Sequence, residues 1–146
     1  IEIVLVGLNP RYIKKHIGIK AVKKTDDVNE LAALYSGAEV FVNPSYLDNF
    51  PSTNLEALSC GTPVVTYRTG GSPEAVDEST GIIVEKGNIG GLNNAISMIM
   101  RSVNKYTPQL CRSRVERNFS SEYQCLEYLK LYEAMLSDKS TIRSCS

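Results

Sequence analysis

The stretch that decides the fold of this chain is DNFPSTNLEALSCGTPVV, residues 48–65. Pro51 has a backbone suited to the start of a helix, and Leu55, Ala57 and Leu58 then follow helical apolar spacing. A glycine closes the pattern, and a short apolar run follows at once. The stretch therefore predicts a helix that begins near Pro51 and is followed by a buried strand.

Strands and helices alternate along the rest of the chain. Strands are predicted at residues 1–7, 18–23, 38–43, 63–67 and 81–84. Further helices are predicted after Asp26-Asp27, at 72–74, around 92–100, at 108–117 and at 121–136. The first strand is an almost continuous apolar run that ends at Gly7, which is typical of a strand covered on both faces. The alternation predicts an α/β fold, a Rossmann-like doubly wound parallel sheet with helices on both faces.

The start of the central helix has the chemistry of a binding site. Free backbone N–H groups and the helix dipole attract anions there, so a diphosphate would fit without a glycine-rich phosphate loop. Glu56 could accept hydrogen bonds from two neighbouring ribose hydroxyls, and Asp48, on the preceding loop, could face another part of the same ligand. Acidic residues at helix starts are also common for structural reasons, so this pattern alone leaves both interpretations open.

The run from Val40 to Val84 resembles the core signature of a known enzyme family. The matching pieces are Pro44-Ser45, Asp48 and Glu56 with seven residues between them, Gly61-Thr62-Pro63-Val64-Val65, Gly70-Gly71-Ser72-Pro73-Glu74 and Gly81-Ile82-Ile83-Val84. Their order and spacing resemble the retaining nucleotide-sugar glycosyltransferases of group 1, or family 4, which are GT-B enzymes with two Rossmann-like domains. The chain departs from the family at Asp48, where Glu is usual, and at Asn49 and Pro51, where many members have Gly.

The resemblance implies a role for particular residues. Asp48 matches the catalytic acid near the transferred sugar, and Glu56 matches the acid that holds the ribose. The residues expected to bind the donor are Asn49, Phe50, Ser52, Thr53, Asn54, Leu55 and Glu56. Lys24 and Thr25 fall in a loop that meets the nucleobase in the family but varies among its members. Gly70 and Gly71 either approach the ligand or serve only the geometry of their turn.

The resemblance also implies what the whole protein does. It predicts that residues 1–146 form one truncated C-terminal domain that binds the nucleotide sugar, with a flexible tail at 137–146. The expected reaction is transfer of a hexosyl-type sugar from a UDP- or GDP-sugar to an acceptor hydroxyl, with retention and without a metal. The acceptor, a saccharide or lipid-linked saccharide, would bind a missing N-terminal domain, and this chain alone would be inactive.

The expected setting is bacterial surface polysaccharide biosynthesis, such as capsule assembly, in a cytoplasmic enzyme that can lie at the inner membrane face. The alternative is a non-catalytic module that binds nucleotide sugars. A dinucleotide-binding domain would need Gly-x-Gly-x-x-Gly after the first strand, and a serine hydrolase would need Gly-x-Ser-x-Gly; the sequence contains neither at the required place.

Composition excludes several other classes. Lys plus Arg and Asp plus Glu number 16 each, so net charge gives no support for nucleic-acid binding. The four cysteines form no Cys-x-x-Cys pair, and with a single histidine, His16, they give no metal-binding pattern. We therefore expect reduced thiols, with Cys60 packed in the interior. No apolar run approaches the length of a membrane span, and no signal peptide is visible.

Overall fold

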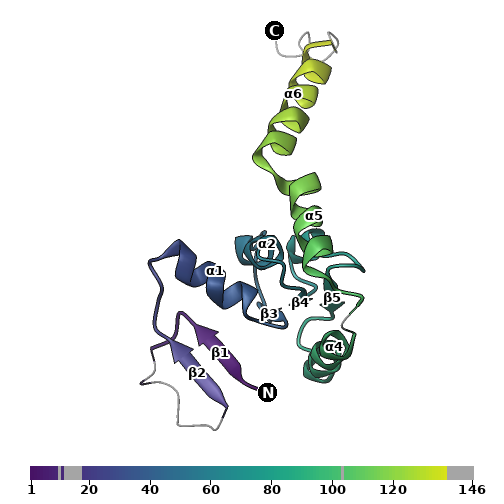
Figure 1. Cartoon of the computed structure of the whole chain (residues 1–146). Coiled ribbons are helices and arrows are strands. Elements are labelled where there is room, and N and C mark those ends of the chain that lie inside the picture. The colour runs from purple at the N-terminus through teal and green to yellow at the C-terminus, as the bar shows by residue number, and fades with distance from the viewer. Residues whose placement is uncertain (10, 12–17, 103, 138–146) are drawn as a thin grey trace.

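The structure is a computed structural model that describes residues 1–9, 11, 18–102 and 104–137 (Figure 1). Most of the segment 8–17, predicted to be a loop or single helical turn, and the tail at 138–146 lie outside the described residues. His16 and Cys145 also fall outside them.

Every strand and helix that the sequence predicts within the described residues is present. The strands are β1 (Ile3–Val6), β2 (Ile19–Val22), β3 (Phe41–Asn43), β4 (Val64–Tyr67) and β5 (Gly81–Val84). The helices are α1 (Val28–Ser36), α2 (Ser52–Ser59), α3 (Ser72–Ala75), α4 (Ile89–Arg101), α5 (Pro108–Phe119) and α6 (Ser121–Ser137). Most strands are shorter in the structure than predicted, because the ends of the apolar runs lie outside the hydrogen-bonded ladders.

The five strands pair in parallel but fall into two sheets. β3, β4 and β5 form a three-stranded sheet in chain order, with Asn43 opposite Thr66, while β1 pairs only with β2. The parallel α/β class is therefore confirmed. The sequence predicts one continuous sheet. In the structure β2 and β3 do not pair, and α1 connects the two separate sheets along the chain (Figure 1).

The three-stranded sheet is covered on both faces, as a doubly wound fold requires. Val64 and Val65 are neighbours on β4 and are fully buried in different apolar clusters. The cluster of Val64 includes Leu58 of α2 and Cys111 of α5, whereas the cluster of Val65 includes residues of α4. Because side chains alternate across a strand, these clusters lie on opposite faces of the sheet.

The first strand differs from the sequence-based expectation. All four residues of β1 are exposed, between 37% and 48% for Ile3, Val4, Leu5 and Val6. The prediction that this strand is covered on both faces is wrong for the described residues. Its apolar pattern is that of a buried strand, but its one hydrogen-bonded neighbour in the structure is β2.

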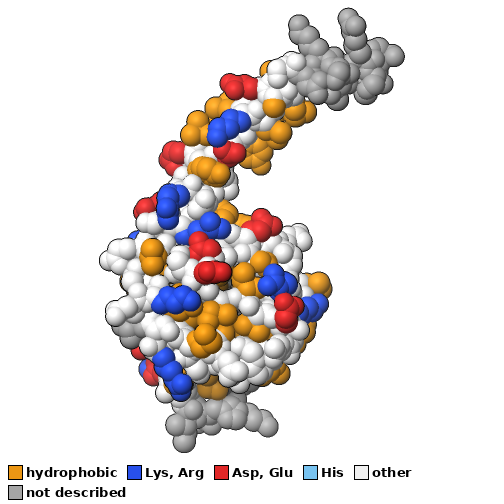
Figure 2. Space-filling view, turned by 90° about the vertical axis from the view of Figure 1, so that its right-hand side faces the viewer, with side chains coloured by type: hydrophobic (Ala, Val, Ile, Leu, Met, Phe, Trp, Pro, Cys, Tyr) orange, Lys and Arg blue, Asp and Glu red, His pale blue; other side chains and the backbone are white. Residues whose placement is uncertain are grey.

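The last helix forms an arm that leaves the body of the molecule (Figure 1). None of its residues is buried, and its apolar side chains are visible along the arm in Figure 2. They include Leu126, Leu129, Leu131, Tyr132, Met135 and Leu136. The amphipathic helix predicted at 121–136 therefore exists, with its apolar residues exposed.

Candidate functional site

The loops that follow β3 and β4 meet at one edge of the sheet. The Thr69 hydroxyl donates to the carbonyl oxygen of Ser45 at 3.0 Å, and the N–H of Gly71 donates to the carbonyl of Asn49 at 2.6 Å. β3 and β4 are parallel neighbours, so their carboxyl ends lie side by side. The structure thus brings together the loop that carries Asp48 and the Gly70-Gly71 turn.

This contact leaves no room for side chains on the glycine turn. A Cβ on Gly70 would lie 1.8 Å from the carbonyl oxygen of Asp48, and a Cβ on Gly71 would lie 2.6 Å from that of Asn49. Gly70 also has a φ of +46°, in the left-handed region that favours glycine. The two glycines are therefore required by the close approach of two backbones.

Helix α2 begins beside these loops without a side-chain cap. Its N-cap is Pro51, which has an extended backbone and forms no side-chain capping bond. Ser52, Thr53 and Asn54 have side chains that commonly cap helices, but all three lie inside the helix and none caps it. The N–H of Asn54 donates to the carbonyl of Pro51 at 3.2 Å. The N–H groups of Ser52 and Thr53 have no intrahelical acceptor, by the geometry of an α-helix, and can bind an anion.

Glu56 lies one turn into α2, and its half-buried carboxylate is held by two donors. The Ser52 hydroxyl donates to Oε1 at 3.0 Å, and the Tyr35 hydroxyl of α1 donates to Oε2 at 3.1 Å. A carboxylate offers about four lone-pair positions, so two remain for a ligand. This arrangement suits recognition of two adjacent hydroxyl groups.

Three other residues of α2 that are expected to bind the donor differ in their exposure. Asn54 is fully buried, and its Oδ1 accepts a hydrogen bond from Asn43 Nδ2 at 3.0 Å, which ties the start of α2 to the end of β3. Leu55 packs against the apolar cluster that contains Leu58. The side chains of Asn54 and Leu55 therefore pack within the protein, whereas Thr53 is exposed at the helix start.

Lys24 and Thr25, in the loop after β2, make local contacts. The Lys24 ammonium pairs with Asp26 at 2.6 Å, with both side chains well exposed, and the Thr25 hydroxyl donates to the Asp27 carbonyl at 2.8 Å. Among the contacts of the described residues, none joins either side chain to α2 or to the Asp48 loop. Their expected role at the nucleobase stays a prediction.

Helix α5 fixes the loops of the site from one side. Phe119, at its end, packs against Phe50 with ring centroids 5.9 Å apart, and the Arg114 guanidinium lies over Phe119 at 5.4 Å. Arg114 also donates through Nη2 to the carbonyl oxygen of Glu74 at 2.9 Å. Sequence reasoning missed this role of Arg114 and Phe119, because it depends on how α5 packs.

Asp77, after α3, organises the turn that leads into β5. Its Oδ1 accepts hydrogen bonds from the N–H and hydroxyl of Ser79, at 3.0 and 2.7 Å, and from the Thr80 hydroxyl at 3.0 Å. Arg114 Nε lies 3.4 Å from Oδ2, an ion-pair distance without the geometry of a hydrogen bond. Partial burial alone would raise the pKa of Asp77, but these bonds and the Arg114 charge outweigh it and lower the pKa below its ordinary value.

The lowered pKa of Asp77 predicts a pH-dependent contribution to stability. Since the folded state favours the charged form, this contribution is present above the pKa of an unfolded Asp, about 4, and is lost as pH falls through the folded pKa. We expect Asp77→Asn to lower the free energy of unfolding by about 1 kcal/mol at pH 7 and by less at pH 3. Urea unfolding of both proteins at the two pH values measures this.

The matched control for Asp77 is Asp26→Asn, which removes an exposed partner of Lys24. Exposed ion pairs contribute little, so we expect a change below about 0.5 kcal/mol at either pH. An equal loss for Asp77→Asn at pH 7 and pH 3 would show that the charge of Asp77 does not stabilise the turn.

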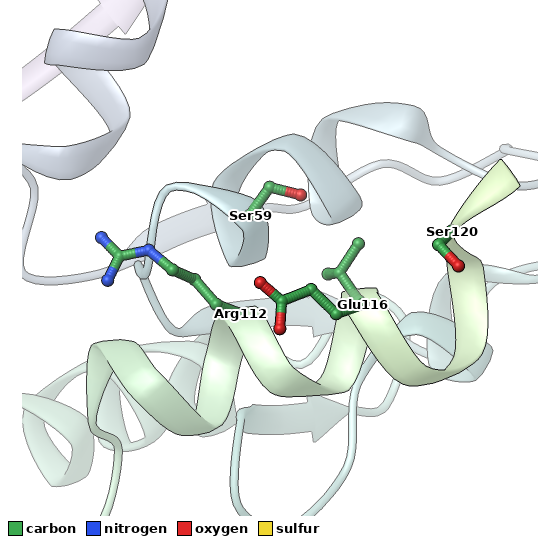
Figure 3. A pocket seen from close by; sticks show the side chains of 5 residues that line it. Ser59, Arg112, Glu116 and Ser120 are labelled. Carbon is green, nitrogen blue, oxygen red and sulfur yellow. The ribbon is translucent and has the colours of Figure 1, made fainter. Parts of the chain in front are cut away.

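A shallow hollow lies elsewhere on the surface, between α2 and α5. It is lined by Ser59, Arg112, Val115, Glu116 and Ser120 (Figure 3). Ser59 is at the C-terminal end of α2, and the other four belong to α5 or follow it directly. None of the expected donor-binding residues lines the hollow, so it is distinct from the candidate donor site at the start of α2.

The described residues lack a cluster of metal ligands, have free thiols and contain no membrane-spanning helix. They contain no cluster of three or more His, Cys, Asp or Glu side chains that could hold a metal ion, and the expectation that no metal is needed stays a prediction. Cys60, Cys111 and Cys125 are free thiols, and Cys60 is half-buried against the core as expected. No helix in this part of the chain is long and apolar enough to cross a bilayer.

Comparison with known proteins supports the resemblance inferred from the motifs. The family described as "Glycosyl transferases group 1" matches residues 1–102, which is more than half of the chain. The D-inositol 3-phosphate glycosyltransferase of Corynebacterium jeikeium (strain K411) is 47% identical over 57 residues, which cover 38% of this chain and 14% of that protein. The chain therefore spans a small part of the length of this curated relative.

Solved structures share the fold. Sucrose-phosphate synthase from Thermosynechococcus elongatus matches with a TM-score of 0.70 and 32% identity, over 82% of this chain and 31% of that one. The Anabaena protein HepE, solved in complex with UDP, matches with a TM-score of 0.66 over 82% of this chain and 32% of that one; at 21% identity it supports the fold alone. The chain therefore belongs to the group 1 glycosyltransferases, with the α/β fold of the GT-B enzymes.

Proposed function

We propose that this chain is the C-terminal, donor-binding domain of a retaining glycosyltransferase. The observation that carries the proposal is the uncapped start of α2, which lies beside the Asp48 loop and holds the Glu56 carboxylate one turn further on. A nucleoside diphosphate has the matching chemistry: phosphates for the free N–H groups and ribose hydroxyls for the carboxylate. The nucleotide sugar is proposed to be a UDP- or GDP-sugar.

The proposed reaction involves groups of this site and groups of an acceptor domain. The bond between the anomeric carbon and the diphosphate oxygen breaks, a bond to the acceptor oxygen forms on the same face of the sugar, and the proton of the acceptor hydroxyl passes to the departing diphosphate. The N–H groups of α2 would stabilise the charge that develops on the departing diphosphate. Asp48 would hydrogen-bond the sugar or stabilise its positive charge, and the backbones of Asn49 and Phe50 would line the sugar.

The finer parts of the proposal concern the acceptor and the setting. We place the acceptor, a saccharide or a lipid-linked saccharide, on a domain outside this chain, and we expect residues 1–146 alone to bind donor without transferring sugar. Surface polysaccharide biosynthesis is the proposed setting, by resemblance alone. A module that binds nucleotide sugars without catalysis is the second candidate, since the features of α2 explain binding equally well in both.

Nucleotide binding tests the proposal. We expect ligand-detected NMR to show saturable binding of one of UDP, GDP and ADP, and Glu56→Ala to weaken it about tenfold or more, because two hydrogen bonds to a charged group are lost. Glu116→Ala is the matched control, since Glu116 is an exposed acid that lines the hollow between α2 and α5. Absence of binding to all three nucleotides, or equal weakening in both variants, would contradict the proposal.

A further inference from the structure

Tyr35 contacts the candidate site from a different part of the chain. It lies in the last turn of α1, is 9% exposed, and donates its hydroxyl hydrogen to Glu56 Oε2 at 3.1 Å, across 21 positions of sequence. Apart from Ser52, which is on the same helix as Glu56, it is the one side chain described as hydrogen-bonded to this carboxylate. The bond therefore ties α1 to α2 at the group proposed to hold the ribose.

The position of the Tyr35 ring is fixed by its surroundings. The ring packs edge-to-face against Phe41 of β3, with centroids 5.3 Å apart and an interplanar angle of 79°. The backbone carbonyl of Tyr35 accepts hydrogen bonds from the Thr62 hydroxyl and from the N–H of Ala38. A rigid ring with two side-chain torsions loses little entropy when it holds a partner in place.

The protonation state of Tyr35 suits a hydrogen-bond donor. Burial, and then the charge of Glu56, raise the pKa of the phenol above its ordinary value. Tyr35 therefore keeps its proton throughout the neutral range and donates it to the carboxylate. Ser52 is exposed and lies one turn before Glu56 on the same helix, so its hydroxyl is free to rotate between water and the carboxylate.

We propose that Tyr35 is a positioning residue, which orients the Glu56 carboxylate so that its two remaining lone pairs face the 2′- and 3′-hydroxyls of the donor ribose. This rests on the proposed function, because it assumes that Glu56 binds the ribose. Tyr35 itself does not touch the ligand in this account. Its effect is on the preference for a ribonucleotide over a nucleotide without these hydroxyls.

The test compares each nucleoside diphosphate with its 2′,3′-dideoxy form. We expect the 146-residue chain to bind the ribonucleotide more tightly, and Tyr35→Phe to lower that ratio of affinities about threefold to tenfold, the effect of one hydrogen bond to a charged group. Binding of the dideoxy form should stay unchanged. Glu56→Ala should remove the preference altogether.

Thr62→Val is the matched control for a general loosening of α1. It removes a buried hydrogen bond to the Tyr35 backbone and leaves the phenol in place, so it should lower thermal stability without changing the ribose preference. If Glu56→Ala removes the preference but Tyr35→Phe keeps it, or if Thr62→Val lowers it equally, the role of Tyr35 is overturned and the proposed function stands. If Glu56→Ala has no effect, the ribose assignment itself fails, and the role of Tyr35 fails with it.

Discussion

Gly70→Ala is expected to destabilise the chain by about 3–5 kcal/mol, near the upper end of what single substitutions cause. The added methyl group would lie 1.8 Å from the Asp48 carbonyl oxygen, and that neighbour is backbone, which cannot turn aside as a flexible side chain would. The φ of +46° adds strain for any residue with a Cβ. Relief requires that the two loops of the site move apart.

Urea unfolding, with Gly90→Ala as control, measures this effect. Gly90 lies in the first turn of α4, and the nearest atom to an added Cβ would be Asn88 Oδ1 at 3.7 Å, an ordinary contact. Alanine there should be neutral or stabilise the chain by up to about 1 kcal/mol, because it restricts the unfolded state. A Gly70→Ala protein as stable as the wild type would contradict the close contact of the two loops.

Asp48→Asn is expected to lower the rate of sugar transfer about 100-fold to 1000-fold, the effect of removing one group that stabilises a charged transition state. Asparagine has nearly the same shape but no charge, so nucleotide binding should change by less than about twofold, since Asp48 is proposed to face the sugar. The rate is measured in a longer protein that includes the acceptor domain, and binding is measured by the same titration as above.

Asp48→Glu separates the charge of the side chain from its length. Glutamate is the usual residue at this position in the family that the sequence resembles, and it keeps the carboxylate with one more methylene. We expect a rate within about tenfold of the wild type, because the charge of the side chain is proposed to stabilise the transition state. Equal rates for the wild type and Asp48→Asn would exclude a catalytic role for the carboxylate.

Local patterns in the sequence were enough to predict the elements of this fold. Pro51 indicates where α2 begins, and Gly61, which has a φ of +88° just past the helix, indicates where it ends. Parallel pairing follows from the alternation of strands and helices. The meeting of the loops after Asn43 and Tyr67 follows in turn, because the carboxyl ends of neighbouring parallel strands share an edge.

What the sequence could not predict depends on packing between distant segments. The apolar pattern of β1 does not indicate which elements lie over the strand, so it cannot predict that the strand is exposed. Tyr35 fits the apolar face of α1 by its spacing, and nothing local indicates that its hydroxyl reaches Glu56. The same holds for Arg114 and Phe119, whose contacts with Glu74 and Phe50 require α5 in place.

The central claim is that a nucleoside diphosphate binds at the start of α2, and an amide NMR titration of the ¹⁵N-labelled chain tests it most directly. With the nucleotide that binds, we expect the largest shifts at the N–H groups of Ser52 and Thr53, with smaller shifts at Glu56 and the Gly70-Gly71 turn. The amides of Arg112 and Glu116, at the hollow between α2 and α5, should not move. Shifts concentrated at that hollow, with the start of α2 unaffected, would contradict the claim.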